Sequence, residues 1–265
     1  VLLCLLLGGC GGEKNETPTT DSAGPLTVAV VNYPLAYFAE RIGAEIVRVP
    51  LDDDFGINLD RLEAAVDNTV SMVYVCNPNN PTGAVYSEDT LRAIAAIAER
   101  HGLVVFSDEI YDQMLYEGAE TVPVATLVEG SLCVTLSGLS KIYRACGYRV
   151  GWIAFSGDRE HAREYLHAVE LLASLRLCAN VPGQWAVQTA LGGYQSIRNL
   201  TEPGGRLYQS RQAVIDGCAA SAYLELQVPM GAMYAFPRVA KDRIPGFDDQ
   251  AFAMELLEKQ HVLIA

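Results

Sequence analysis

Short apolar segments alternate with amphipathic helical segments between residues 26 and 155, and this alternation constrains the fold more than any other feature of the sequence. Several of the apolar segments lack polar positions on either face, which is typical of strands buried in a parallel sheet. Strands are expected at 26–31, 45–49, 71–76, 103–106, 132–136 and 150–155. Helices are expected at 33–42, at 58–66 and between Ser87 and Gly102. The pattern predicts an α/β fold with a mostly parallel sheet flanked by helices.

The pattern changes after residue 158. Residues 159–222 are nearly all helical in character, with breaks at 180–182 and 203–205. A strand pair at 224–228 and 232–236 and a helix at 248–259 are expected next, which indicates part of a smaller α+β C-terminal domain. We therefore predict an atypical N-terminal segment (1–25), an incomplete large domain (26–215) and a partial small domain (216–265).

The two ends of the chain are unusual. Residues 1–7 are apolar, and Leu7-Gly8-Gly9-Cys10 resembles a bacterial lipoprotein cleavage site. No basic segment precedes it, and the apolar run is too short to span a bilayer. The alternatives are the end of a buried helix that enters a loop, or a sequence defect or wrong start. At the other end, residues 262–265 form an apolar, strand-like run, so the chain is expected to be truncated at both ends.

Charge and cysteine content exclude two classes of function. The net charge is −13 and no basic run is present, so nucleic acid is not an expected partner. The seven cysteines include no C-x-x-C pair, and the four histidines form no ligand pattern with them, so no metal site is predicted. Scattered cysteines of odd number favour reduced thiols and a cytoplasmic location.

Three polar segments each directly follow an expected strand. They are Asn77–Gly83, Ser107–Tyr111 and Ser137–Lys141. In open α/β sheets ligands bind at the carboxyl ends of the strands, so these segments mark a candidate site.

Each segment also has a simpler interpretation. The first can be a rigid turn, although Asn80 within it can donate a hydrogen bond above the sheet edge. Asp108 is either a helix cap or a fixed charge that faces a ligand. Lys141 can extend to the surface, or it can lie in a partly dry pocket where a lowered pKa suits Schiff-base formation. Arg149 can bind an anion in a bidentate manner.

Taken together, NPNNPTG, SDEIY and SGLSK-x7-R, the last ending at Arg149, resemble the fold-type I pyridoxal-phosphate (PLP) aminotransferases of classes I and II in order and spacing. The resemblance extends from about Leu26 to the end of the chain. Segments 171–182 and 190–197 are most similar to bacterial alanine (glutamate–pyruvate) aminotransferases.

The resemblance implies a role for each site residue. Lys141 would form a Schiff base with PLP and then act as general acid and base. Asp108 would keep the pyridine nitrogen protonated. Asn80 and Tyr111 would both hydrogen-bond the phenolic oxygen of the cofactor.

Three further residues complete the expected site. Arg149, with Ser140 beside it, would bind the phosphate of the cofactor. Tyr33 would stack on the ring, or it is an ordinary tyrosine at the start of a helix. In this family a glycine-rich turn that contacts the phosphate precedes the matched region, and the arginine that binds the substrate carboxylate follows it. This chain is therefore expected to lack both.

The implied activity is transamination between an L-amino acid and a 2-oxo acid, with alanine and 2-oxoglutarate as the expected pair. The resemblance also implies a homodimer that acts in amino acid metabolism and biosynthesis. Three alternatives remain open at this stage: another PLP enzyme on the same scaffold, such as a C–S lyase; an inactive PLP-binding fragment; and a lipoprotein with an unrelated role.

Overall fold

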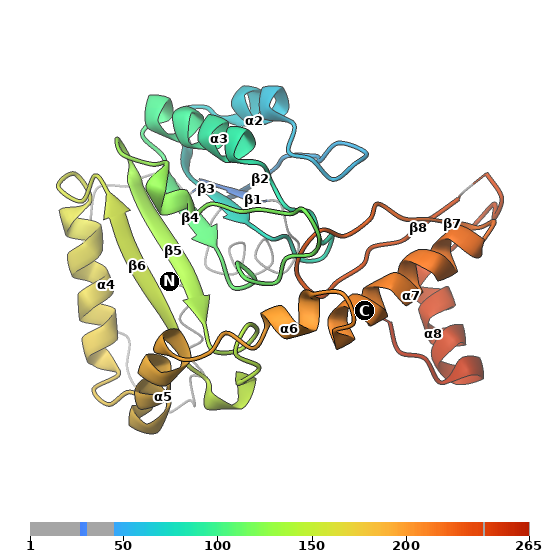
Figure 1. The fold of residues 1–265 in the computed structure, drawn as a ribbon. Helices are drawn as coiled ribbons and strands as arrows, with labels where there is room; N and C mark the ends of the chain where they lie inside the picture. The colour runs from blue at the N-terminus through green and yellow to red at the C-terminus, as the bar shows by residue number, and fades with distance from the viewer. Residues whose placement is uncertain (1–26, 31–44, 241, 265) are drawn as a thin grey trace, which may run out of the picture.

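A computed structural model describes residues 27–30, 45–240 and 242–264 of the chain. Within them, six strands form one sheet in the order β2-β1-β3-β4-β5-β6 (Figure 1). The strands are β1 (Thr27–Val30), β2 (Glu45–Arg48), β3 (Val70–Cys76), β4 (Val104–Asp108), β5 (Leu132–Gly138) and β6 (Gly151–Gly157). Neighbouring strands from β2 to β5 are parallel, and β6 is antiparallel to β5. The predicted fold class is thereby confirmed.

Helices α2 (Leu59–Ala65) and α3 (Glu88–His101) lie together on one face of the sheet (Figure 1). Ser87 caps α3 by accepting a hydrogen bond from the Thr90 amide, and Gly102 ends the helix in a left-handed conformation. The apolar stripe of α3, including Leu91 and Ile94, is buried against the strands. Both helices were expected from their caps and their periodicity.

A second apolar cluster covers the opposite face. It joins Tyr74, Phe106 and Val134 of the strands to partly buried residues of α4 (Arg163–Leu175). Helix α5 (Val181–Gly192) follows, and Asn180 caps it by accepting from the Gly183 amide. The break expected at 180–182 is thus the start of a new helix. Two short 3-10 turns, η1 (Val124–Thr126) and η2 (Cys146–Tyr148), lie in the connections.

The last part of the chain forms a separate group beside the sheet (Figure 1). Its elements are α6 (Arg198–Thr201), α7 (Arg206–Ala220), β7 (Leu224–Glu225), β8 (Arg238–Val239) and α8 (Asp249–Gln260). Helix α7 runs through the predicted domain boundary at 215/216, which stays a prediction. The helix expected at 33–42 and the segment 1–25, with its lipoprotein-like site, lie outside the described residues.

The predicted strand pair 224–228/232–236 is wrong. β7 pairs instead with β8, and the segment between them returns to the large sheet. The amides of Met230 and Gly231 donate to the Gly83 carbonyl at 2.8 and 2.9 Å, and the Ala232 amide donates to the Met114 carbonyl at 2.8 Å. Because these backbone groups are bonded to the sheet edge, they cannot form a hairpin with residues 224–228.

The expectation of a buried strand at 262–265 is also wrong for the residues described. Residues 262–264 form no strand, and Leu263 is 79% exposed. The five cysteines described are all free, and three of them (Cys76, Cys133 and Cys218) are buried. In the described ranges, no helix has the length and apolar character needed to cross a membrane.

Candidate active site

The three polar segments lie at the carboxyl ends of three adjacent strands, β3, β4 and β5. Backbone hydrogen bonds join them beyond the strands: the Asn77 amide donates to the Asp108 carbonyl at 3.1 Å, and the Glu109 amide donates to the Leu136 carbonyl at 2.9 Å. The segments are therefore held side by side at one sheet edge, where the α/β architecture places ligands.

Asp108 is the last residue of β4, and a turn follows it, so the interpretation of Asp108 as a helix cap is wrong. Its Oδ2 accepts a hydrogen bond from the Tyr74 hydroxyl at 2.7 Å, and its Oδ1 accepts from the Ile110 amide at 3.2 Å. Burial raises the pKa of Asp108, while the bonds from Tyr74 and Ile110 and the charge of Lys141 lower it. The unfavourable effect of burial on the ionised carboxylate is thus partly offset by two hydrogen-bond donors and by the Lys141 amine.

Lys141 lies in the turn after β5 and is half-buried, so it does not extend freely into solvent. Its Nζ lies 5.7 Å from the centroid of the Tyr111 ring. The same amine is close enough to Asp108 to lower the pKa of that carboxyl group. The structure therefore brings Asp108, Tyr111 and Lys141 together.

Tyr111 is buried, and its hydroxyl shares a hydrogen bond of 2.6 Å with the Tyr234 hydroxyl. The two rings meet edge to face, with centroids 5.6 Å apart. Burial, followed by the contact with Tyr234, raises the pKa of Tyr111, so its phenol stays protonated. Sequence reasoning missed Tyr234 because it placed this residue in a distant strand pair.

Asn80 lies in the turn after β3, between residues that serve the turn itself. Asn77 accepts from the Tyr86 amide at 2.8 Å, and Asn79 accepts from the Thr82 hydroxyl at 2.8 Å. Both of these asparagines are buried, whereas Asn80 is only half-buried. The rigid-turn interpretation therefore accounts for the first two, and the side-chain amide of Asn80 makes no hydrogen bond to any residue that the structure describes.

The remaining predicted residues are less closely joined to this group. Ser140 is half-buried beside Lys141. Arg149 is exposed, and its Nη1 donates to the Cys146 carbonyl at 2.8 Å. Tyr33 lies outside the described residues.

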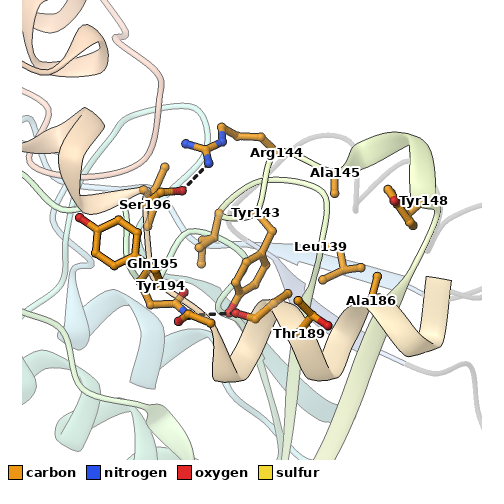
Figure 2. Close-up of a pocket in the computed structure, with 14 residues that line it drawn as sticks. Leu139, Tyr143, Arg144, Ala145, Tyr148, Ala186, Thr189, Tyr194, Gln195 and Ser196 are labelled. Carbon is orange, nitrogen blue, oxygen red and sulfur yellow. Dashed lines mark hydrogen bonds between the residues drawn. The ribbon is translucent and has the colours of Figure 1, made fainter. Parts of the chain in front are cut away.

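A hollow of about 450 Å³ lies beside the lysine segment, between residues 139–148, α5 and residues 193–197. Figure 2 shows Arg144 and Ser196 at one side of it, joined by a hydrogen bond of 2.5 Å. Leu139 and Ile142 line it, but Lys141 and the other predicted site residues described here do not. This hollow is therefore distinct from the group around Asp108.

Comparison with known proteins identifies the family. Residues 35–265 match the model of the class I and II aminotransferases. The chain belongs to this family. A glutamate-pyruvate aminotransferase AlaA of Escherichia coli (strain K12) is 40% identical over 247 residues, and an alanine aminotransferase of Mycobacterium bovis is 42% identical over 203 residues.

Solved aminotransferase structures share the fold. One from Escherichia coli matches with a TM-score of 0.86 at 40% identity, covering 92% of this chain and 61% of that chain. An alanine aminotransferase from Pyrococcus furiosus matches with a TM-score of 0.80 at 28% identity, covering 90% of this chain and 61% of that chain. The match to Escherichia coli AlaA includes 92% of this chain but only 61% of the AlaA sequence. The match to the mycobacterial relative includes 77% of this chain and 47% of that sequence.

The cofactor of this aminotransferase family is PLP, and the described residues fit it. A carboxylate that accepts two hydrogen bonds in a largely buried position suits a protonated ring nitrogen. A half-buried amine beside a protonated phenol suits an aldehyde and the neighbouring ring oxygen. The donor set at this sheet edge is therefore chemically complementary to PLP.

Proposed function

We propose that this protein transfers amino groups between an L-amino acid and a 2-oxo acid with PLP as cofactor. The observation that carries the proposal is the grouping of Lys141, Asp108 and Tyr111 at one sheet edge. The family supports the reaction type, and the names of the relatives support alanine and 2-oxoglutarate as the substrate pair.

When bound, PLP supplies an aldehyde and a ring that accepts electrons from the substrate. We assign to Lys141 Nζ the attachment to that aldehyde and, once released, the movement of a proton at the substrate carbon. The Asp108 carboxylate holds a proton on the ring nitrogen. The Tyr111 hydroxyl and the side-chain amide of Asn80 would donate hydrogen bonds to the ring oxygen and so help to hold the cofactor.

The phosphate is assigned to Arg149 and Ser140. Arg149 presents a guanidinium whose geometry suits bidentate contacts to phosphate oxygens. Its present bond to the Cys146 carbonyl uses one of five N–H donors, so the others stay available. Stacking by Tyr33 is proposed from the sequence resemblance alone.

A homodimer and a cytoplasmic location are part of the proposal. Helices α4 and α5 and the link between them expose large apolar side chains, among them Leu175 at 78%, Leu177 at 90% and Trp185 at 71%. Exposed apolar surface of this kind is typical of protein interfaces and supports a second copy here. Free cysteines, two of them exposed, support a reducing compartment.

The test is the visible absorbance of the cofactor bound to the purified protein. Lys141→Ala is expected to abolish the absorbance of the PLP–lysine Schiff base, because no other amine is assigned to the aldehyde. Lys259→Ala is the matched control, since Lys259 lies exposed on α8 in an ion pair with Glu255. Retention of the absorbance in Lys141→Ala would count against the proposal.

The same sample separates transamination from C–S elimination. Transamination of alanine converts the bound cofactor to pyridoxamine phosphate, and 2-oxoglutarate reverses the change. Elimination needs an amino acid with a sulfur leaving group at its β-carbon, supplied in a parallel reaction; it expels that sulfur group, regenerates the original absorbance and releases ammonia. Ammonia release without pyridoxamine phosphate would therefore reject the aminotransferase activity while leaving PLP binding intact.

A further inference from the structure

We propose that Tyr74 is a positioning residue that keeps the Asp108 carboxylate ionised and oriented toward the ring nitrogen of PLP. The inference rests on the proposed function and deepens it. Nothing in the sequence motifs pointed to Tyr74, which lies within an apolar strand.

The sheet register places Tyr74 for this role. In the pairing of β3 with β4, Cys76 lies opposite Asp108 and Tyr74 lies opposite Phe106. Tyr74 therefore precedes the partner of Asp108 by two residues, and side chains two residues apart in a strand share a face. From this position the Tyr74 hydroxyl donates to Asp108 Oδ2 at 2.7 Å.

The ring of Tyr74 is fixed by packing. The residue is only 8% exposed, and it belongs to the apolar cluster that includes Phe106 and Met114. A ring held in a dense core has few alternative rotamers, so the direction of its O–H bond to Asp108 is defined.

Two donors from different segments fix the plane of the carboxylate. Tyr74 on β3 binds Oδ2, and the Ile110 amide, from the turn after β4, binds Oδ1 at 3.2 Å. A carboxylate offers about four lone-pair positions, so acceptor capacity remains for a further N–H donor. The bond from Tyr74 thus orients the Asp108 carboxylate and still leaves acceptor positions open.

Tyr74 matters most for the ionisation of Asp108. Burial is the largest influence on Asp108 and raises its pKa, and the Tyr74 hydroxyl is the largest of the influences that lower it. The Ile110 amide and the Lys141 amine lower the pKa of Asp108 further. Without Tyr74, burial would be opposed mainly by one amide and by an amine that is itself needed for the chemistry.

The other titratable groups that face Asp108 do not replace this bond. Burial raises the pKa of the Cys76 thiol to about 12, and burial also raises the pKa of Tyr74 and of Tyr111. These groups stay neutral near pH 7. Glu109 is buried beside Asp108, and burial, together with a smaller effect of the Asp108 charge, raises the pKa of Glu109, so Glu109 supplies no positive charge or further donor that lowers the pKa of Asp108.

The chain offers a matched control. Tyr86 is as buried as Tyr74, at 4% exposed, but its hydroxyl has no hydrogen-bond partner among the described residues. Tyr86→Phe therefore removes the same atom from the same kind of environment without touching Asp108.

The first measurement uses the cofactor-free protein. The pKa of Asp108 is followed by carbon-13 NMR of aspartate-labelled protein, with the signal assigned by Asp108→Asn. Tyr74→Phe is expected to raise this pKa by about one to two units, as a lost hydrogen bond to a charged group implies. Tyr86→Phe is expected to leave it unchanged, and an unchanged pKa in Tyr74→Phe would overturn the inference.

The second measurement is the affinity for PLP, from quenching of protein fluorescence at neutral pH. Tyr74→Phe is expected to weaken binding about tenfold, and the loss should vanish in the Asp108→Asn background because Tyr74 acts through Asp108. An equal loss in both backgrounds would reject the positioning role. Failure of the unmodified protein to bind PLP would instead reject the proposed function, together with this inference.

Discussion

Gly83, the last residue of the NPNNPTG motif, is expected to be intolerant of a side chain because the C-terminal segment packs directly on it. Its φ is +72°, and a Cβ there would lie 2.4 Å from the Pro229 Cβ and 2.9 Å from the Tyr234 carbonyl oxygen. The left-handed conformation costs an alanine about 1–2 kcal/mol, and overpacking adds about 1–3 kcal/mol. Gly83→Ala should therefore destabilise the protein by about 2–5 kcal/mol.

Gly118 separates the two contributions. Its φ is +74°, nearly that of Gly83, but a Cβ built on Gly118 meets no atom within 4 Å. Gly118→Ala should therefore cost only the conformational part, about 1–2 kcal/mol. The difference between the two variants measures the contact of Gly83 with residues 229–234.

The free energy of unfolding is measured by urea denaturation of both variants, with limited trypsin digestion as a local probe. If residues 229–234 detach in Gly83→Ala, cleavage at Arg238 and Arg243 should accelerate, and it should not do so in Gly118→Ala. Equal destabilisation of the two variants, with unchanged cleavage, would refute the docking of the C-terminal segment on Gly83.

Two further predictions follow from buried polar groups. Tyr234→Phe removes the 2.6 Å bond to Tyr111 and should destabilise the protein by about 1–2 kcal/mol in urea unfolding. The loss should exceed that of Tyr208→Phe, which removes an exposed bond to Glu117, and a smaller loss would contradict the pairing. Burial, followed by the charge of Glu109, raises the pKa of Asp112 to about 6. The folded state thus binds the proton more tightly than the unfolded state, so stability falls as pH rises from about 4 to about 6. In Asp112→Asn this fall should be absent, so from about pH 4 to pH 8 the free energy of unfolding of the variant should rise by about 1–3 kcal/mol relative to that of the wild type. If the free energies of unfolding of the two proteins change in parallel with pH, the effect is refuted.

Local patterns were sufficient for the sheet, and they predicted a candidate site at its carboxyl edge. The strands differ from their expected bounds by only a few residues, because short apolar runs between turn residues typically form buried strands in an α/β chain. The proximity of Asp108 and Lys141 agrees with the topology, since parallel strands end at the same edge. Asp108 was placed just past its strand, whereas the ladder with β5 continues through it.

Contacts between distant parts of the chain could not be read in the same way. Residues 232–236 look like a strand locally, but the Ala232 amide donates to the Met114 carbonyl, which lies more than 110 residues earlier in the sequence. Tyr74 was counted as one more apolar strand residue, because its hydroxyl matters only once β4 is aligned beside β3. In both cases the hydrogen-bond partner of a side-chain hydroxyl or a backbone amide is distant in sequence, so the local sequence does not specify it.

Gly83 shows how one motif serves two parts of the molecule. The turn that ends β3 contains Asn80, and the carbonyl of Gly83 in the same turn accepts hydrogen bonds from the amides of Met230 and Gly231. Three residues beyond Gly231, Tyr234 binds the hydroxyl of Tyr111. The C-terminal segment and the site therefore share one rigid turn. A change at Gly83 should move Tyr234 away from Tyr111 even though Gly83 touches neither hydroxyl, so the glycine of this motif is required for packing as much as for the turn.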